Sequence, residues 1–214
     1  MTKVRRRRLS EAGYSMMELL FTVGILSVVS LTAVLQTESS RQAAKGDGAM
    51  RVVLAQLNTA QQLAITQRRN MRVTFINNNQ VQIIREEVPG PTLTTLSTVY
   101  LEGTLQFATV ANVPDTPDAF CSGSIVPVSF PTATGVPPEV KFQPDGTFVN
   151  QDGIPLNGTI FLAVPGQTFT RVSNNGDRVL RSSGVLSTRA ATIMGSTGRV
   201  HGYRFDGNMW QPVS

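Results

Sequence analysis

The 214-residue sequence contains very few of the side chains that metal sites and catalytic centres use. It has one cysteine, Cys121, and one histidine, His201. A single cysteine excludes an intramolecular disulfide, so an exported domain would have to be stabilised by core packing alone. A single histidine excludes a multi-histidine metal site. No phosphate-binding glycine loop, dinucleotide fingerprint or Cys-x-x-Cys pair occurs.

The remaining candidates for catalysis have plain structural interpretations. We expect Cys121 to be a small buried or loop residue, with a lipidated, metal-binding or intermolecular thiol as the alternatives. His201 lies in a predicted strand, where a structural or surface role is expected. The two could pair as nucleophile and base, but neither has a recognisable catalytic context. The carboxylate pairs Glu86–Glu87 and Asp115/Asp118 lie near prolines or turns and are interpreted as solvated loop charges. We therefore predict that the chain is not an enzyme and uses no cofactor or metal.

The basic charge is concentrated at the N-terminus. The chain has a net charge of +5 and a pI near 10, but residues 1–13 alone carry a net +4 from Lys3, the run 5–8 and Glu11. Lysine and arginine next to an apolar segment favour the cytoplasmic side of a membrane. The pattern predicts a single-pass protein with a cytoplasmic N-terminus and a domain on the other side.

A long apolar run follows this basic segment. No residue from Leu19 to Thr37 is charged, and Glu18 lies immediately before the run. At about 1.5 Å per residue, residues 14–35 nearly match a bilayer core. An ordinary single-pass anchor and a cleaved secretory signal peptide are alternatives. The run is long for a signal peptide, and no Ala-x-Ala-like cleavage site follows Leu35.

Glu18 needs a positive partner, because a carboxylate in an apolar helix is costly. If the chain is cut after Gly13, Tyr14 carries a free amino group and Glu18 becomes the fifth residue. Positions i and i+4 share one helix face, so this amine could come from the same chain or from a neighbour staggered by about a turn.

Helical spacing predicts one long helix over 14–68. Its first half is apolar all round, and its second half carries an apolar stripe on one face. Gly46 and Gly48 lie close together, so we expect the helix to be bent or frayed there. The stripe consists of Met50, Val53, Leu54, Leu57, Gln61, Ala64 and Ile65.

After Asn70 the period changes to two, which predicts an antiparallel β domain over 70–214. Asn77–Gln80 has the residues of a hairpin turn, and 173–188 is expected to be a loop. The expected strands are 71–76, 81–85, 92–101, 105–110, 125–130, 139–142, 147–149, 159–164, 189–194, 199–205 and 209–213. The fold class is therefore α+β: a leader (1–13), a helical spine (14–68, with 14–35 in the membrane or a helix bundle) and the β domain.

The N-terminus resembles the type IV prepilin signal, which is a short basic leader, a glycine, an aromatic residue, and glutamate at the fifth mature position. Here these are Gly13, Tyr14 and Glu18, with Tyr14 in place of the usual Phe and Met16 at the third mature position. The resemblance implies cleavage between Gly13 and Tyr14 by a prepilin peptidase, N-methylation of Tyr14, and an assembly role for Glu18. It also implies an inner-membrane precursor, other pilin subunits and a membrane assembly platform as partners, and a periplasmic or extracellular filament.

The β domain is similar to the GspH/FimT class of minor pilins and pseudopilins. The similarity lies in Phe142–Thr147, the apolar strand 159–164 and the strand–turn–strand that ends Gly198-Arg199-Val200. It implies a minor subunit of a type IV pilus or of a type II secretion pseudopilus, in the tip or initiation complex.

The C-terminal segment suggests an alternative function. Residues 171–214 carry a net +4, and clustered arginines could bind DNA phosphates during uptake. The plain interpretation is ordinary surface arginines on different strands. The arginines are Arg171, Arg178, Arg181, Arg189, Arg199 and Arg204.

Overall fold

The computed structural model describes residues 15–90, 92–121, 125–130, 137–150, 152–166, 170–172, 178–180 and 187–213. Within these ranges the side chains of 32–39, 170–172 and 178–180 are not described. The chain divides into two compact units, Met1–Glu38 and Ser39–Ser214. Helix α1 (Met16–Gln67) contributes residues to both units.

The long helix matches its prediction closely. It ends where Arg68 takes a positive φ of 49°, and the Arg69 N–H donates to the Ala64 carbonyl at 3.2 Å. A left-handed residue just after the last turn is a common helix ending. The expected fraying at Gly46–Gly48 is wrong, because α1 is helical through both glycines.

The first sheet contains five antiparallel strands in the order β3-β2-β1-β5-β6. Asn77 and Asn78, in the turn between β1 and β2, both have positive φ, as a type I′ hairpin turn requires. A turn at Pro144–Gly146 joins β5 and β6, between the predicted strands 139–142 and 147–149. The bounds are β1 (Met71–Ile76), β2 (Gln80–Glu86), β3 (Leu93–Tyr100), β5 (Glu139–Phe142) and β6 (Phe148–Val149).

The second sheet is also antiparallel, in the order β12-β11-β10-β7-β4. Every residue of β7 is buried, which agrees with the apolar strand predicted at 159–164. The predicted hairpin of β10 and β11 and the last strand are confirmed. The bounds are β4 (Gln106–Phe107), β7 (Gly158–Ala163), β10 (Arg189–Met194), β11 (Arg199–Phe205) and β12 (Trp210–Val213).

Two predictions in the loops are wrong in part. A short pair, β8 (Thr170–Val172) with β9 (Arg178–Leu180), reaches into the predicted loop 173–188. Segment 125–130 forms no full strand; it lies beside β7 through a bridge between Val128 and Ile160.

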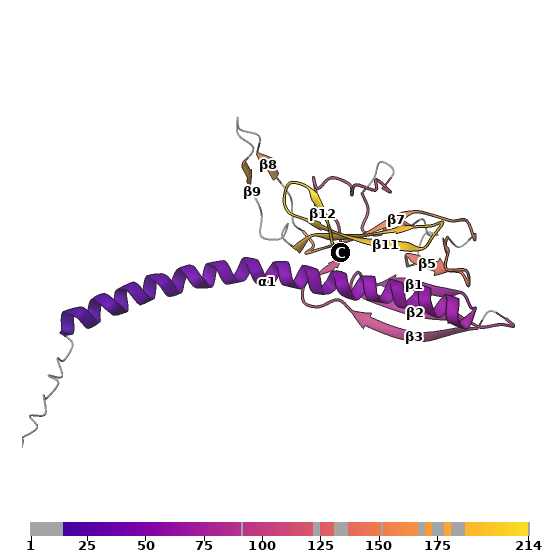
Figure 1. Cartoon of the computed structure of the whole chain (residues 1–214), viewed down its shortest axis with the longest axis horizontal. Helices are drawn as coiled ribbons and strands as arrows, with labels where there is room; N and C mark the ends of the chain where they lie inside the picture. Colours follow the sequence, from indigo (N-terminus) through magenta and orange to yellow (C-terminus); the bar gives the residue numbers. More distant parts are fainter. Residues whose placement is uncertain are drawn as a thin grey trace, which may run out of the picture. The chain divides into compact units, whose positions relative to one another are not determined.

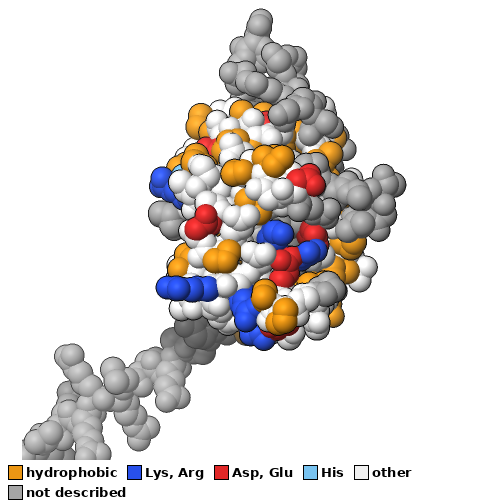
Figure 2. Space-filling model, turned by 90° about the vertical axis from the view of Figure 1, so that its right-hand side faces the viewer, with side chains coloured by type: hydrophobic (Ala, Val, Ile, Leu, Met, Phe, Trp, Pro, Cys, Tyr) orange, Lys and Arg blue, Asp and Glu red, His pale blue; other side chains and the backbone are white. Residues whose placement is uncertain are grey.

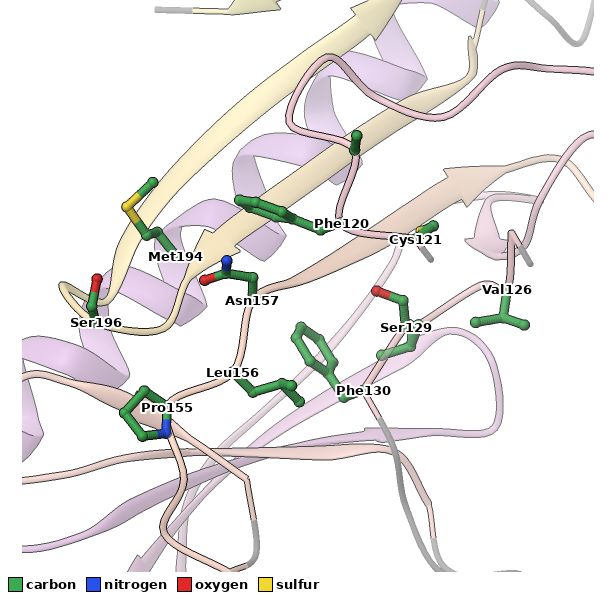
Figure 3. Close-up of a pocket in the computed structure, with 12 residues that line it drawn as sticks. Phe120, Cys121, Val126, Ser129, Phe130, Pro155, Leu156, Asn157, Met194 and Ser196 are labelled. Atoms are coloured by element: carbon green, nitrogen blue, oxygen red, sulfur yellow. The ribbon is translucent and has the colours of Figure 1, made fainter. Parts of the chain in front are cut away.

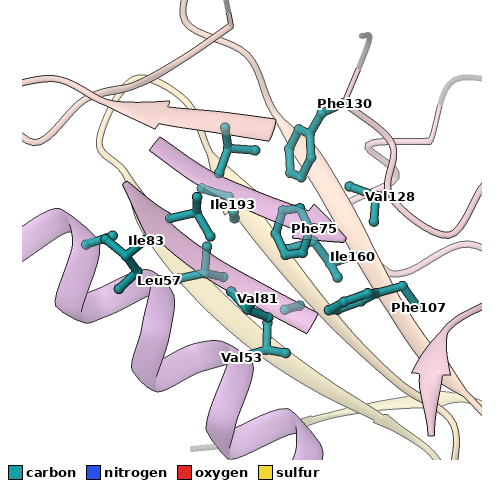
Figure 4. Packing of buried hydrophobic residues seen from close by; sticks show 14 of the residues in the cluster. Val53, Leu57, Phe75, Val81, Ile83, Phe107, Val128, Phe130, Ile160 and Ile193 are labelled. Atoms are coloured by element: carbon teal, nitrogen blue, oxygen red, sulfur yellow. The ribbon is translucent and has the colours of Figure 1, made fainter. Parts of the chain in front are cut away.

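Both sheets pack on residues 49–64 of α1 (Figures 1 and 4). Val53 and Leu57 are completely buried and point toward Val81 and Ile83 of β2. The predicted stripe is thus confirmed at its centre, but Ile65 at its end is 44% exposed. The helix residues with at most 1% exposure are Ala49, Met50, Val53, Leu57, Ala60 and Ala64.

Gln61 joins α1 to both sheets through a turn of each. Its side-chain amide donates to the carbonyl of Gly146 at 3.0 Å and to that of Thr197 at 3.2 Å. Gly146 belongs to the β5–β6 turn and Thr197 to the β10–β11 turn. Gln61 was expected in the apolar stripe, and its position there serves hydrogen bonding.

A second apolar cluster covers the opposite face of the β12–β4 sheet. Phe161, Phe205 and Trp210 lie there under loop residues such as Val110 and Val113. The loop is fixed by polar contacts of its own. The Asp118 carboxylate accepts hydrogen bonds from Thr192 Oγ1 at 2.5 Å and from Tyr203 Oη at 3.1 Å, and the Trp210 indole N–H donates to the Pro114 carbonyl at 2.9 Å.

Candidate functional site

The first part of α1 presents an apolar surface on every side. Between Leu19 and Leu31 the large apolar side chains are 52–66% exposed within this unit. Exposed apolar area of this extent indicates a surface that another apolar surface covers.

The few polar side chains of this segment are satisfied by the helix itself. Thr22 donates its hydroxyl to the Leu19 carbonyl at 2.9 Å, Ser27 to Val23 at 2.8 Å, and Ser30 to Leu26 at 2.7 Å. Hydroxyls that return to the carbonyl three or four residues earlier leave no unpaired donor at the surface. The segment can therefore enter an apolar environment without the cost of an unsatisfied hydrogen bond.

Gly24 leaves a notch in this apolar surface. No atom lies within 4 Å of a Cβ built on it. The side chains around it, including Leu20, Phe21 and Val28, line a shallow hollow of about 370 Å³. Small residues of this kind allow the backbone of a second helix to come close.

Glu18 lies in the first turn of α1 with its side chain exposed. The unpaired N–H groups at a helix N-terminus favour a carboxylate there by about 0.3–1 kcal/mol at an exposed site. That is far less than the cost of burying an unpaired carboxylate, so the helix end alone cannot neutralise Glu18 in an apolar environment. Gly13 and Tyr14 lie outside the described residues.

The described part of the chain contains no helix with the length and apolar character that crossing a membrane requires.

The C-terminal arginines with described side chains do not form one surface. Arg189 is completely buried, and Arg199 and Arg204 are exposed but five positions apart on β11. Side chains alternate along a strand, so these two point to opposite faces of the sheet. Arg171 and Arg178 lie on β8 and β9, where side chains are not described, and Arg181 lies outside the described residues.

Charge is mixed on the face of the molecule shown in Figure 2, where basic and acidic side chains lie next to each other. Arg72 forms ion pairs with Glu86 and with Glu139, and Lys141 approaches Glu86 at 3.8 Å. Glu86 is half-buried, and burial opposes its ionisation; hydrogen bonds from Asn70 and Arg72 outweigh that effect and leave its pKa below the ordinary value. The prediction of solvated loop charges is therefore wrong for Glu86, and it is wrong for Asp118 as well.

Cys121, a loop residue, and His201 lie beside different strands of the second sheet. Cys121 contacts Ser129 and Thr159 at β7, whereas His201 lies on β11 against Tyr203. Strand β10 separates β7 from β11, so His201 and Thr159, the β7 residue that Cys121 contacts, are about two strand spacings apart, roughly 9–10 Å. This geometry gives no support to a nucleophile–base pair.

Cys121 is 7% exposed at the edge of an open pocket of about 950 Å³ (Figure 3). Burial is the main reason that the pKa of its thiol is raised, with Asp115 adding to the effect. A thiol with a raised pKa is a poor nucleophile at neutral pH. The described residues also contain no group of three or more histidine, cysteine, aspartate or glutamate side chains placed to hold a metal ion.

Comparison with known proteins gives one relevant structure. No family model matches the sequence, and no curated protein matches it. The type IV minor pilin FimU of Pseudomonas aeruginosa aligns with 86% of this chain and 96% of its own, at 15% identity and a TM-score of 0.39. The case for function therefore rests on the residues of the chain itself.

Proposed function

We propose that this chain is a minor pilin-type subunit whose N-terminal helix packs in the core of a helical filament and whose β domain faces outward. The observation that carries the proposal is that the two parts of α1 have different surroundings. Its first part exposes apolar side chains on all sides with every described hydroxyl satisfied, and its second part is the core of the β domain.

In this proposal Glu18 selects the register between helices. The segment 15–37 contains no lysine or arginine, so the cation that neutralises Glu18 must come from residues 1–14 or from another molecule. We propose the α-amino group of Tyr14 on an adjacent subunit, freed by cleavage after Gly13 and methylated. Before assembly, residues 14–35 would anchor the precursor in the bacterial inner membrane, with the β domain in the periplasm.

The tip or initiation complex is the proposed position, with a prepilin peptidase and a membrane assembly platform as the machinery. The resemblance to GspH/FimT proteins supports a minor subunit and is compatible with a pilus or a secretion pseudopilus. We favour the pilus. DNA binding is not part of the proposal, because the described arginines are either buried or on opposite faces.

Mass spectrometry of the N-terminal peptide, from protein purified out of its native membrane, tests the processing. The expected peptide begins at Tyr14 and carries one additional methyl group. A peptide that still contains residues 5–8 would contradict the proposal. Gly13→Phe should block cleavage, because a large side chain keeps the protease from the backbone at this position.

The role of Glu18 is tested by incorporation into filaments. Glu18→Gln keeps the shape of the side chain and removes the charge, so cleavage should be normal while the amount in sheared filaments falls at least about tenfold. Glu102→Gln is the matched control, because Glu102 is an exposed carboxylate of the β domain. Normal incorporation of the Glu18→Gln protein would rule out charge pairing as the basis of assembly.

A further inference from the structure

The inference concerns how α1 stays helical across its two glycines. Glycine destabilises a helix interior by about 1 kcal/mol relative to alanine, and Gly46 and Gly48 are separated by a single residue. The helix nevertheless runs through them without interruption. A contact from outside the helix would offset this cost.

Arg189, the first residue of β10, makes that contact. Its side chain is completely buried, and its Nε and Nη2 both lie 2.7 Å from Oδ1 of Asp47, the residue between the two glycines. Nη2 also donates to the carbonyl of Ala43 at 3.0 Å. One guanidinium thus contacts both a side chain and a backbone carbonyl of the turn that contains Gly46.

Gly46 is required for this approach and Gly48 is not. A Cβ on Gly46 would lie 2.6 Å from the Ser187 carbonyl oxygen and 3.1 Å from Cζ of Arg189, so only glycine fits. At Gly48 nothing lies within 4 Å of a Cβ. Gly48 therefore weakens the helix without any packing reason to be glycine.

We propose that residues 46–48 are a built-in hinge of α1 and that Arg189 is the latch that holds it closed. With Arg189 paired to Asp47, the turn of α1 around Gly46 and Gly48 stays helical. With the pair broken, the turn opens at the glycines. The latch can be reached from solvent at its carboxylate end, because the Asp47 side chain is 36% exposed while that of Arg189 is fully buried. This inference does not depend on the proposed function.

Hydrogen exchange of the full chain in detergent tests the latch. Arg189→Met keeps much of the side-chain volume and removes the hydrogen bonds. Exchange of the amides of 44–51 should accelerate at least about tenfold, while those of β1 and β11 change little, because opening is local. Arg199→Gln, an exposed arginine of the same hairpin, is the control and should change neither region.

Gly48→Ala distinguishes two roles of Arg189: holding the glycine-containing turn in a helix, and simply filling space in the core. In the Arg189→Met background it should return much of the lost protection, because alanine strengthens the helix at a position where its Cβ meets nothing. If Arg189→Met accelerates exchange equally in all strands, or if Gly48→Ala restores nothing, the latch is overturned. Should Arg189→Met fail to fold, Asp47→Asn gives the same comparison with the arginine in place.

A distance measurement gives a second readout. Spin labels at Arg41 and Asn58, both exposed on α1, lie about 26 Å apart along an intact helix. In a Cys121→Ser background this distance should be narrowly distributed, and it should broaden in Arg189→Met and narrow again with Gly48→Ala. A narrow distribution in all three proteins would overturn the hinge.

Discussion

The β domain should fold only when the second half of α1 is present. A chain that begins at Asn70 contains every strand but lacks the helix that covers the inner faces of both sheets. A chain that begins at Ser39 contains the whole compact unit. We expect the longer fragment to fold cooperatively and the shorter one to remain unfolded.

The magnitude follows from the buried side chains. Met50, Val53 and Leu57 are at most 1% exposed, and the sheet residues that they touch would be exposed to water in the shorter fragment. Burying one such side chain contributes about 1.5–3 kcal/mol. Exposing three or four apolar side chains on the sheets to water would therefore cost about 5–12 kcal/mol. That is comparable to the whole free energy of unfolding of a typical domain, about 5–15 kcal/mol.

The assay is urea unfolding followed by the fluorescence of Trp210, the single tryptophan of the chain. Trp210 is 7% exposed in the cluster on the far side of the second sheet, so it reports on a part of the fold that the helix does not touch. The Ser39 fragment should give one sigmoidal transition, and the Asn70 fragment should show an exposed indole without urea. A cooperative transition of the Asn70 fragment at a similar midpoint would refute the argument that α1 completes the core.

Three further changes test particular contacts, the first two by the same fluorescence assay. Leu57→Ala should lower the free energy of unfolding by about 2–5 kcal/mol, because the residue is completely buried in the main core; an effect below 1 kcal/mol would contradict this burial. Asp118→Ala should cost about 1–3 kcal/mol, because the hydroxyls of Thr192 and Tyr203 lose their acceptor, whereas the exposed Glu102→Ala should cost almost nothing. Cys121 in the folded protein should react with iodoacetamide at pH 8 at least about tenfold more slowly than in urea, because burial raises its pKa and restricts access; equal rates would show that the thiol is exposed.

The periodic parts of the chain were predictable because one physical effect dominates each of them. The alternation of apolar and polar residues predicted the bounds of β1, β2, β10 and β11 to within one or two residues of those in the structure. Helical spacing predicted the buried face of α1. The two-asparagine turn was also predictable, since asparagine tolerates the positive φ that the hairpin needs. In each case the local preference and the final burial agree.

The charged residues were harder to predict, since their roles depend on contacts distant in the sequence. Arg189 and Asp47 are 142 positions apart, and Asp118 lies 74 positions before Thr192. From the sequence alone, Arg189 was predicted to be one of the surface arginines of the C-terminal segment. Asp118 was predicted to be a solvated charge in a loop. The one local indication was that Arg189 begins a strand whose other residues, apart from Thr192, are apolar. A charged side chain on the helix-facing side of such a strand must be paired.

Glu18 differs from these residues in a way that bears on function. Arg189 and Asp118 are neutralised or hydrogen-bonded within their own domain, so their charges need no other molecule. Glu18 is exposed beside the uncharged, largely apolar run from Leu19 to Thr37, and the next lysine or arginine after it is Arg41. At 1.5 Å per helical residue that cation is about 35 Å away along α1, which is too far for direct pairing. A second molecule that covered the apolar segment would have to supply the cation unless residues 1–14 did so, and for that reason Glu18 is the residue on which the filament proposal depends most directly.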